Sequence, residues 1–133
     1  MGVVSDENLA ALLARARFLA FPARAEFFGY AVAEALASGT PVLAFDYGGP
    51  SEQVTSGRSG WLVRSDREFV ETARKVYRSG YPPSMRLEAR ASADRFSLSA
   101  CAQRLVDALG SGAPPARAAG REPHGATSLS DAP

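Results

Sequence analysis

Two acidic side chains lie eight residues apart, one on each side of a glycine, and together they could hold a ligand. The acids are Glu26 and Glu34, and the glycine is Gly29. Glu26 follows a predicted buried strand in a loop, whereas Gly29 stands where an alanine-rich helix is predicted to begin. In a parallel sheet, ligands bind in the crevice at the carboxyl ends of the strands. The residues therefore predict a binding site at that edge of a sheet.

The spacing of the two acids suits an extended ligand with an anionic centre. Eight residues of helix rise about 12 Å at ~1.5 Å per residue. This length is an upper estimate of the separation along the helix axis, because Glu26 is predicted to precede the helix. That length is of the order of a sugar–diphosphate–ribose unit, whose two ends carry hydroxyls that donate to carboxylates. The free N–H groups at a helix start suit the diphosphate, and Gly29 lets a ligand approach the backbone closely. We therefore expect a nucleotide sugar to span Glu26 and Glu34.

The segment that contains these acids resembles a known signature. Residues 26–42 read EFFGYAVAEALASGTPV, which is similar to the E-x7-E signature of retaining GT-B glycosyltransferases, especially the family 4 type. Three later motifs resemble the same family in the same order: Gly48-Gly49 with Glu52 and Val54 (G-G-x-x-E-x-V), residues 60–63 (G-x-L-V), and residues 96–97 (F-S). The resemblance runs from about residue 3 to residue 109, and the ordered set is far more specific than two acids alone.

The resemblance implies a role for each matching residue. Glu26 would contact the donor sugar near the reacting centre, and Glu34 would hold the ribose hydroxyls. The main-chain N–H groups of Phe28, Gly29 and Tyr30 would face the diphosphate. The reaction would transfer a sugar with retention of its anomeric configuration, without a metal or cofactor. The main task of the protein would be to stabilise charge on the departing nucleotide diphosphate.

The resemblance also implies that parts of the enzyme lie outside this chain. In the family, an Arg and Lys pair that neutralises the diphosphate lies in the first half of the donor domain, and the acceptor is bound by a separate N-terminal domain. Both would precede Met1. Arg24 could replace the basic pair, but we favour a solvated loop arginine. We therefore expect the chain to bind donor poorly and to be inactive alone.

Other residues at the same predicted edge leave two interpretations open. Glu52 could bind the donor, or it could be a first-turn acid that the helix dipole favours. Tyr30 could stack on a base, although we favour packing over the helix start. Gly48 and Gly49 could form only a turn, but we favour a turn that admits the ligand. Trp61 is expected to pack at the edge of its strand.

The elements that must position these residues alternate between strand and helix. Three short apolar runs predict buried parallel strands, over 18–21, 41–45 and 61–63. Apolar residues at helical spacing predict six helices, from Ser5-Asp6 to about 16, then 29–38, 50–54, 66–77, 83–95 and 98–109. Gly39 is predicted to cap the second helix. The fold class is therefore α/β, a partial Rossmann-like parallel sheet with C-terminal helices. By resemblance, the strands would be the fourth, fifth and sixth of a GT-B C-terminal domain.

Composition narrows the class of protein further. The 133 residues carry a formal net charge of +1, which gives no electrostatic reason to expect a nucleic-acid partner. No apolar run is long enough to span a membrane and no signal peptide is evident, so we expect a cytoplasmic protein whose parent could be peripheral at the inner membrane face. Cys101 is interpreted as a small buried residue of a helix. We expect residues 1–109 to form a partial nucleotide-sugar-binding domain and 110–133, with His124, to form a disordered tail.

Three hypotheses for function follow. The first is a fragment of a glycosyltransferase donor site, and the second is a non-catalytic remnant or interaction module with the same half-domain. A sugar-nucleotide epimerase is the third, although the spacing of Glu26 and Glu34 disfavours it. The strand at 18–21 would lack the neighbour that a complete domain supplies, so its open edge predicts self-association.

Overall fold

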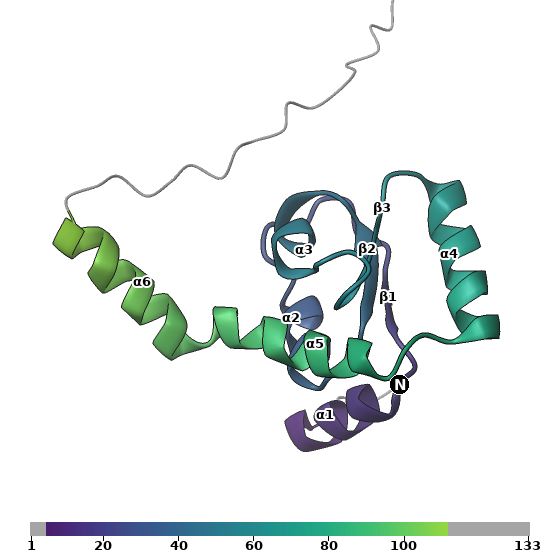
Figure 1. Cartoon of the computed structure of the whole chain (residues 1–133), viewed down its shortest axis with the longest axis horizontal. Coiled ribbons are helices and arrows are strands. Elements are labelled where there is room, and N and C mark those ends of the chain that lie inside the picture. The colour runs from purple at the N-terminus through teal and green to yellow at the C-terminus, as the bar shows by residue number, and fades with distance from the viewer. Residues whose placement is uncertain (1–4, 112–133) are drawn as a thin grey trace, which may run out of the picture.

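A three-stranded parallel sheet forms the centre of the fold. The computed structural model describes residues 5–111, so the predicted tail lies outside the described residues apart from its first two positions (Figure 1). The strands lie in the order β1, β2, β3, with bounds Leu19–Phe21, Val42–Phe45 and Gly60–Val63. Leu19 is in register with Val42, and Val42 with Gly60. The predicted α/β class and parallel sheet are confirmed.

Helices follow each strand and continue beyond the sheet. They are α1 (Asp6–Arg15), α2 (Tyr30–Ala37), α3 (Gly48–Gln53), α4 (Asp66–Ser79), α5 (Ser84–Ala93), a short 3-10 helix η1 (Asp94–Phe96) and α6 (Leu98–Ser111). The helix bounds agree with the expected ranges to within two residues, and one of the largest shifts is the start of α3 at Gly48 rather than Pro50. The 3-10 helix η1, which was not predicted, separates α5 from α6.

The helices cover the two faces of the sheet unequally. Alternate residues of a strand point to opposite faces. Val42 and Ala44 of β2 face a core formed with α2, α5 and the residues that flank them. Leu43 and Phe45 face a smaller core, which Phe69 and Ala73 of α4 cover from the other side. Figure 1 shows α4 alone on that side and α6 extending away from the sheet.

Three local expectations have clear outcomes. Gly39 follows α2 with a left-handed φ of 71°, and the Thr40 N–H donates to Ala35 O at 2.8 Å, which is the expected glycine cap. Trp61 packs at the edge of the smaller core against the Phe18 ring, as predicted. The burial predicted for Cys101 is wrong, because α6 extends from the body and leaves this side chain exposed.

The outer edge of β1 has no partner strand within residues 5–111, since β1 pairs with β2 alone. Among the helices in this part of the chain, none combines the length and the apolar character required to cross a bilayer.

Candidate functional site

The loops that follow the three strands meet at the carboxyl edge of the sheet. Because the strands are parallel, residues 22–29, 46–47 and 64–65 all emerge on that side. The Asp46 N–H donates to Val63 O at 2.8 Å, and the Arg64 Nε lies 3.3 Å from the Asp46 carboxylate. These contacts join the second loop to the third.

Glu26 connects the first loop to the starts of α2 and α3. Its side chain is half-buried, and Oε1 accepts the Gly29 N–H at 3.3 Å. Its main-chain oxygen accepts the Gly49 N–H at 3.1 Å. Gly29 is the residue before α2 and has a φ of 80°, a backbone conformation that strongly favours glycine. The predicted carboxylate and the predicted helix start are therefore in direct contact.

The glycine pair of α3 packs tightly against the same loop. A Cβ on Gly48 would lie 2.4 Å from Glu26 O, and one on Gly49 would lie 2.4 Å from Phe28 O. No side chain fits in either space, so the two glycines let the start of α3 approach the loop backbone. This approach explains why α3 begins two residues earlier than expected, where a turn was predicted. Gly48 is exposed and Gly49 is buried.

Gln53 holds the same loop from the other end of α3, and sequence reasoning missed it. Its side chain is 1% exposed, and Nε2 donates to the Phe28 carbonyl. Its Oε1 has no hydrogen-bond partner among the described residues. Arg95 donates to the Gln53 main-chain oxygen at 3.3 Å. The sequence around Gln53, in a short helix that also contains Ser51 and Glu52, carries no signal that this side chain is buried.

Glu34 lies on the solvent side of α2. The core side of this helix consists of Val32, Ala35 and Leu36, whereas Tyr30 and Glu34, four residues apart, share the opposite side. The Tyr30 ring contacts the Phe28 ring edge-on at 4.9 Å between centroids, yet Tyr30 is 75% exposed. The packing that we favoured for Tyr30 is therefore wrong for most of the ring, because the helix turns it away from the core.

Three further side chains belong to the loops and helix at the carboxyl edge of the sheet. Phe27 is 99% exposed between Glu26 and Phe28, and no sequence signal distinguished it. Glu52 is exposed on α3. Arg24 is an exposed loop arginine, as we favoured, and it also lies 2.5 Å from the Asp66 carboxylate with its guanidinium 4.1 Å from the centroid of the Phe45 ring.

This arrangement offers complementary groups to a ligand. Glu26 and Glu34 supply acceptors for hydroxyl groups on either side of the α2 start. The first N–H groups of a helix have no acceptor within the helix, and together with its dipole they favour an anion. Exposed aromatic rings at Phe27 and Tyr30 border the same surface.

Comparison with protein families identifies the group to which the fold and these residues correspond. Residues 1–94 match the family model described as glycosyl transferases group 1, which is more than half of the chain. The chain belongs to the glycosyl transferases group 1 family.

Individual curated proteins with a similar sequence are also glycosyltransferases, in agreement with the family match. A D-inositol 3-phosphate glycosyltransferase of Nocardioides sp. is 44% identical over 75 residues, which cover 55% of this chain and 16% of the relative. An alpha-1,3/1,6-mannosyltransferase of Neurospora crassa is 45% identical over 51 residues, 38% of this chain and 11% of that protein. This group 1 chain therefore spans less than a fifth of the length of these curated relatives.

A solved structure shares the fold. The Anabaena protein HepE, crystallised with UDP-glucose, superposes with a TM-score of 0.67 at 25% sequence identity. The superposition covers 84% of the group 1 chain and 31% of HepE. A second crystal structure of HepE, with UDP and glucose, gives a TM-score of 0.65. The partial Rossmann-like fold predicted from the sequence is that of a segment of a glycosyltransferase.

Proposed function

We propose that this chain forms part of the donor site of a retaining GT-B glycosyltransferase, and that the donor is a nucleotide-diphosphate sugar. The whole enzyme would transfer the sugar to an acceptor that binds elsewhere. The observation that carries the proposal is the contact between Glu26 and Gly29 at the start of α2, with Glu34 on the solvent side of the same helix. HepE, which has a similar fold, is described in complex with UDP-glucose.

Each residue of the site has a proposed task. Glu26 contacts the sugar near the reacting carbon, and Glu34 accepts hydrogen bonds from the ribose hydroxyls. The main-chain N–H groups around Phe28, Gly29 and Tyr30 bind the diphosphate, whose charge they stabilise as it departs.

The neighbouring helix and ring have supporting tasks. Gly48 and Gly49 keep α3 close enough to support the loop, and Glu52, exposed on the same helix, is proposed to contact the donor. Tyr30 is 75% exposed, which leaves most of its ring available to stack on a base.

The donor site requires groups beyond these residues. Arg24 is already paired with Asp66 and lies over Phe45, so it is poorly placed to neutralise a diphosphate. We infer that the basic pair and the acceptor domain come from other parts of the enzyme, and that residues 1–109 are one portion of the donor domain. The isolated chain would then be inactive, as a non-catalytic remnant would also be.

The proposal is tested by donor binding. UDP-glucose binding and turnover are measured on the protein with all of the sequence that its gene encodes upstream, and on its Glu26→Ala and Glu34→Ala variants. Loss of one hydrogen bond to a charged group costs about 1.5–3 kcal/mol, so each variant should bind about 10- to 150-fold more weakly. Glu7→Ala, which removes an exposed acid of α1, is the matched control.

Two results would contradict the proposal. Normal binding and turnover in both Glu26→Ala and Glu34→Ala would show that the site is misplaced. A gene that begins at Met1, with no donor binding by its product, would support the non-catalytic remnant.

A further inference from the structure

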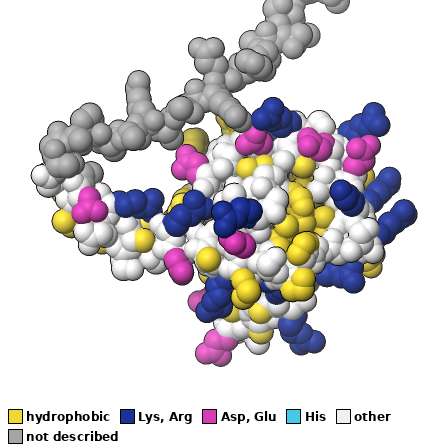
Figure 2. Space-filling view, in the orientation of Figure 1, with side chains coloured by type: hydrophobic (Ala, Val, Ile, Leu, Met, Phe, Trp, Pro, Cys, Tyr) yellow, Lys and Arg dark blue, Asp and Glu magenta, His cyan; other side chains and the backbone are white. Residues whose placement is uncertain are grey.

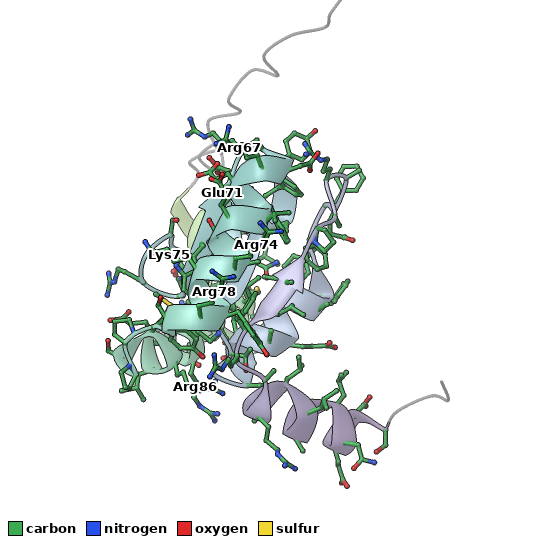
Figure 3. All side chains as sticks on the ribbon, turned by 90° about the vertical axis from the view of Figure 1, so that its right-hand side faces the viewer. Arg67, Glu71, Arg74, Lys75, Arg78 and Arg86 are labelled. Atoms are coloured by element: carbon green, nitrogen blue, oxygen red, sulfur yellow. The ribbon has the colours of Figure 1, made fainter. Side chains whose placement is uncertain are left out.

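Helix α4 presents a row of basic side chains to solvent. Its core side consists of Phe69, Ala73 and Val76. Arg67, Arg74 and Arg78 lie on the opposite side, because residues seven and eleven apart share one side of a helix. Figure 3 shows these three with Lys75 along the exposed side of α4. We call Arg67, Arg74, Lys75 and Arg78 the basic ridge.

Charge is distributed unevenly along α4. The acids Asp66, Glu68 and Glu71 all lie in the first half of the helix. Glu71 pairs with Arg67 at 2.8 Å. Arg74, Lys75 and Arg78 form no ion pair with any described residue. The second half of α4 is therefore a concentrated positive surface on a chain whose net charge is only +1.

Neighbouring residues extend this surface. Arg17 donates to the Tyr77 carbonyl, and its guanidinium lies 5.5 Å from the centroid of the Tyr77 ring. Tyr77 is 68% exposed, and Val70 is exposed on the same flank of α4. Arg86 appears nearby in Figure 3, but it donates to Ala16 O at 2.9 Å and is therefore part of the internal structure. Figure 2 shows the gathering of Lys and Arg side chains over the edge of the molecule where α4 lies.

The basic end of α4 lies far from the candidate donor site. Helix α4 begins after β3, at the carboxyl edge of the sheet, and runs back to the opposite edge. Arg17, two residues before β1, marks that opposite edge. The C-terminal part of the ridge, formed by Arg74, Lys75 and Arg78, is therefore poorly placed to supply the cation that a diphosphate at the α2 start requires, and it stays accessible when that site is occupied.

We propose that the basic ridge docks the protein on an anionic phospholipid membrane. A planar surface can meet the C-terminal end of α4 alone, whereas a nucleic-acid duplex along the helix would also meet the acids of its first half. Arginine and lysine stems with an exposed tyrosine suit the boundary between headgroups and water. Because the apolar side of α4 is packed on the sheet, attachment is electrostatic, reversible and weakened by salt. The inference is independent of the proposed function.

Vesicle co-sedimentation of the 133-residue chain tests the proposal. Vesicles of phosphatidylcholine are compared with vesicles that also contain phosphatidylglycerol, at low salt and at physiological salt. Binding should require phosphatidylglycerol and weaken with salt. Each basic residue near an anionic surface contributes about five-fold in binding, so the triple variant Arg74→Gln, Lys75→Gln, Arg78→Gln should bind at least about tenfold more weakly. Glu71→Gln, which releases Arg67, should bind more tightly.

A matched triple variant separates the ridge from overall charge. Arg15→Gln, Arg90→Gln, Arg104→Gln removes three exposed cations from α1, α5 and α6, and should bind vesicles nearly as the unmodified chain does. Circular dichroism of each variant checks that the fold is kept. Equal losses in both triples, no binding of the unmodified chain, or tighter binding to a DNA duplex than to anionic vesicles would each overturn the proposal.

Discussion

At the residue scale, the candidate site depends on close backbone packing as much as on its acids. Gly48 and Gly49 leave no room for a side chain against the loop that contains Glu26. Gln53 fixes the Phe28 carbonyl of that loop from within the core. The position of the Glu26 carboxylate is thus set by residues of α3, which is more than twenty positions away in the chain.

Substitution of Gly49 tests this packing. In Gly49→Ala the new methyl group would meet the backbone of Phe27 and Phe28 at 2.4–2.5 Å, and backbone cannot rotate away. Overpacking of this kind costs about 1–3 kcal/mol, so the urea midpoint should fall. Gly110→Ala, where nothing lies within 4 Å of the added methyl group, should cause no loss. An unchanged midpoint for Gly49→Ala would show that the loop moves freely.

Sequence reasoning located residues with a motif and missed those without one. Glu26 and Gly29 were predicted together because an acid and a glycine before a helix have direct chemical meaning, and the structure places them in contact. Arg24 is exposed in its loop as expected, but its partners Asp66 and Phe45 were not predicted, because they come from other elements and only tertiary structure joins them. Cys101 was misjudged because helical spacing alone does not show whether anything covers the helix.

At the element scale, strands and helices were predictable because each has a local signal. Apolar runs predicted the three strands. Asp66 was predicted to cap the helix that it begins, whereas the structure makes Asp66 the first residue of α4 and Ser65 its N-cap. The start of α3 was predicted two residues too late because non-local packing decides it: Gly48 and Gly49 extend the helix where they approach the loop that follows β1. The start of α4 is the best-defined cap, since Ser65 Oγ accepts the Glu68 N–H at 3.2 Å.

The cap of α4 is tested with Ser65→Ala. Losing the hydrogen bond to the Glu68 N–H should destabilise the chain by about 1 kcal/mol, measured by urea denaturation. Ser5 also precedes a helix, but its side chain makes no capping hydrogen bond. Ser5→Ala should therefore change stability by only a few tenths of a kcal/mol. Equal effects of the two substitutions would contradict a specific role for Ser65.

At the scale of the whole molecule, the sheet is asymmetric and small. Only β2 is flanked by a strand on both sides, and β1 pairs on one side within residues 5–111. An unpaired row of N–H and C=O groups can pair with another chain. We therefore expect the open edges and the few short strands to make the described part of this chain depend on further partners for its full stability.

Sedimentation tests whether the unpaired edge of β1 causes the chain to self-associate. The chain should sediment above its 14.0 kDa monomer mass as concentration rises. Ala20→Lys places a charge on β1, which discourages edge pairing and should shift the chain toward monomer. Ala10→Lys adds the same charge to an exposed position of α1 and should leave association unchanged. A monomer at all concentrations, with a sharp two-state urea transition, would refute self-association.

The hydrogen bond between the Glu26 carboxylate and the Gly29 amide has a consequence for ligand entry. In the proposed donor site, the Glu26 carboxylate would hold the Gly29 amide until a phosphate binds there, because both groups are anionic acceptors. A phosphate that accepts this N–H would displace the carboxylate. The displaced carboxylate would then be available to the sugar hydroxyls, so binding of the phosphate would prepare the site for the sugar.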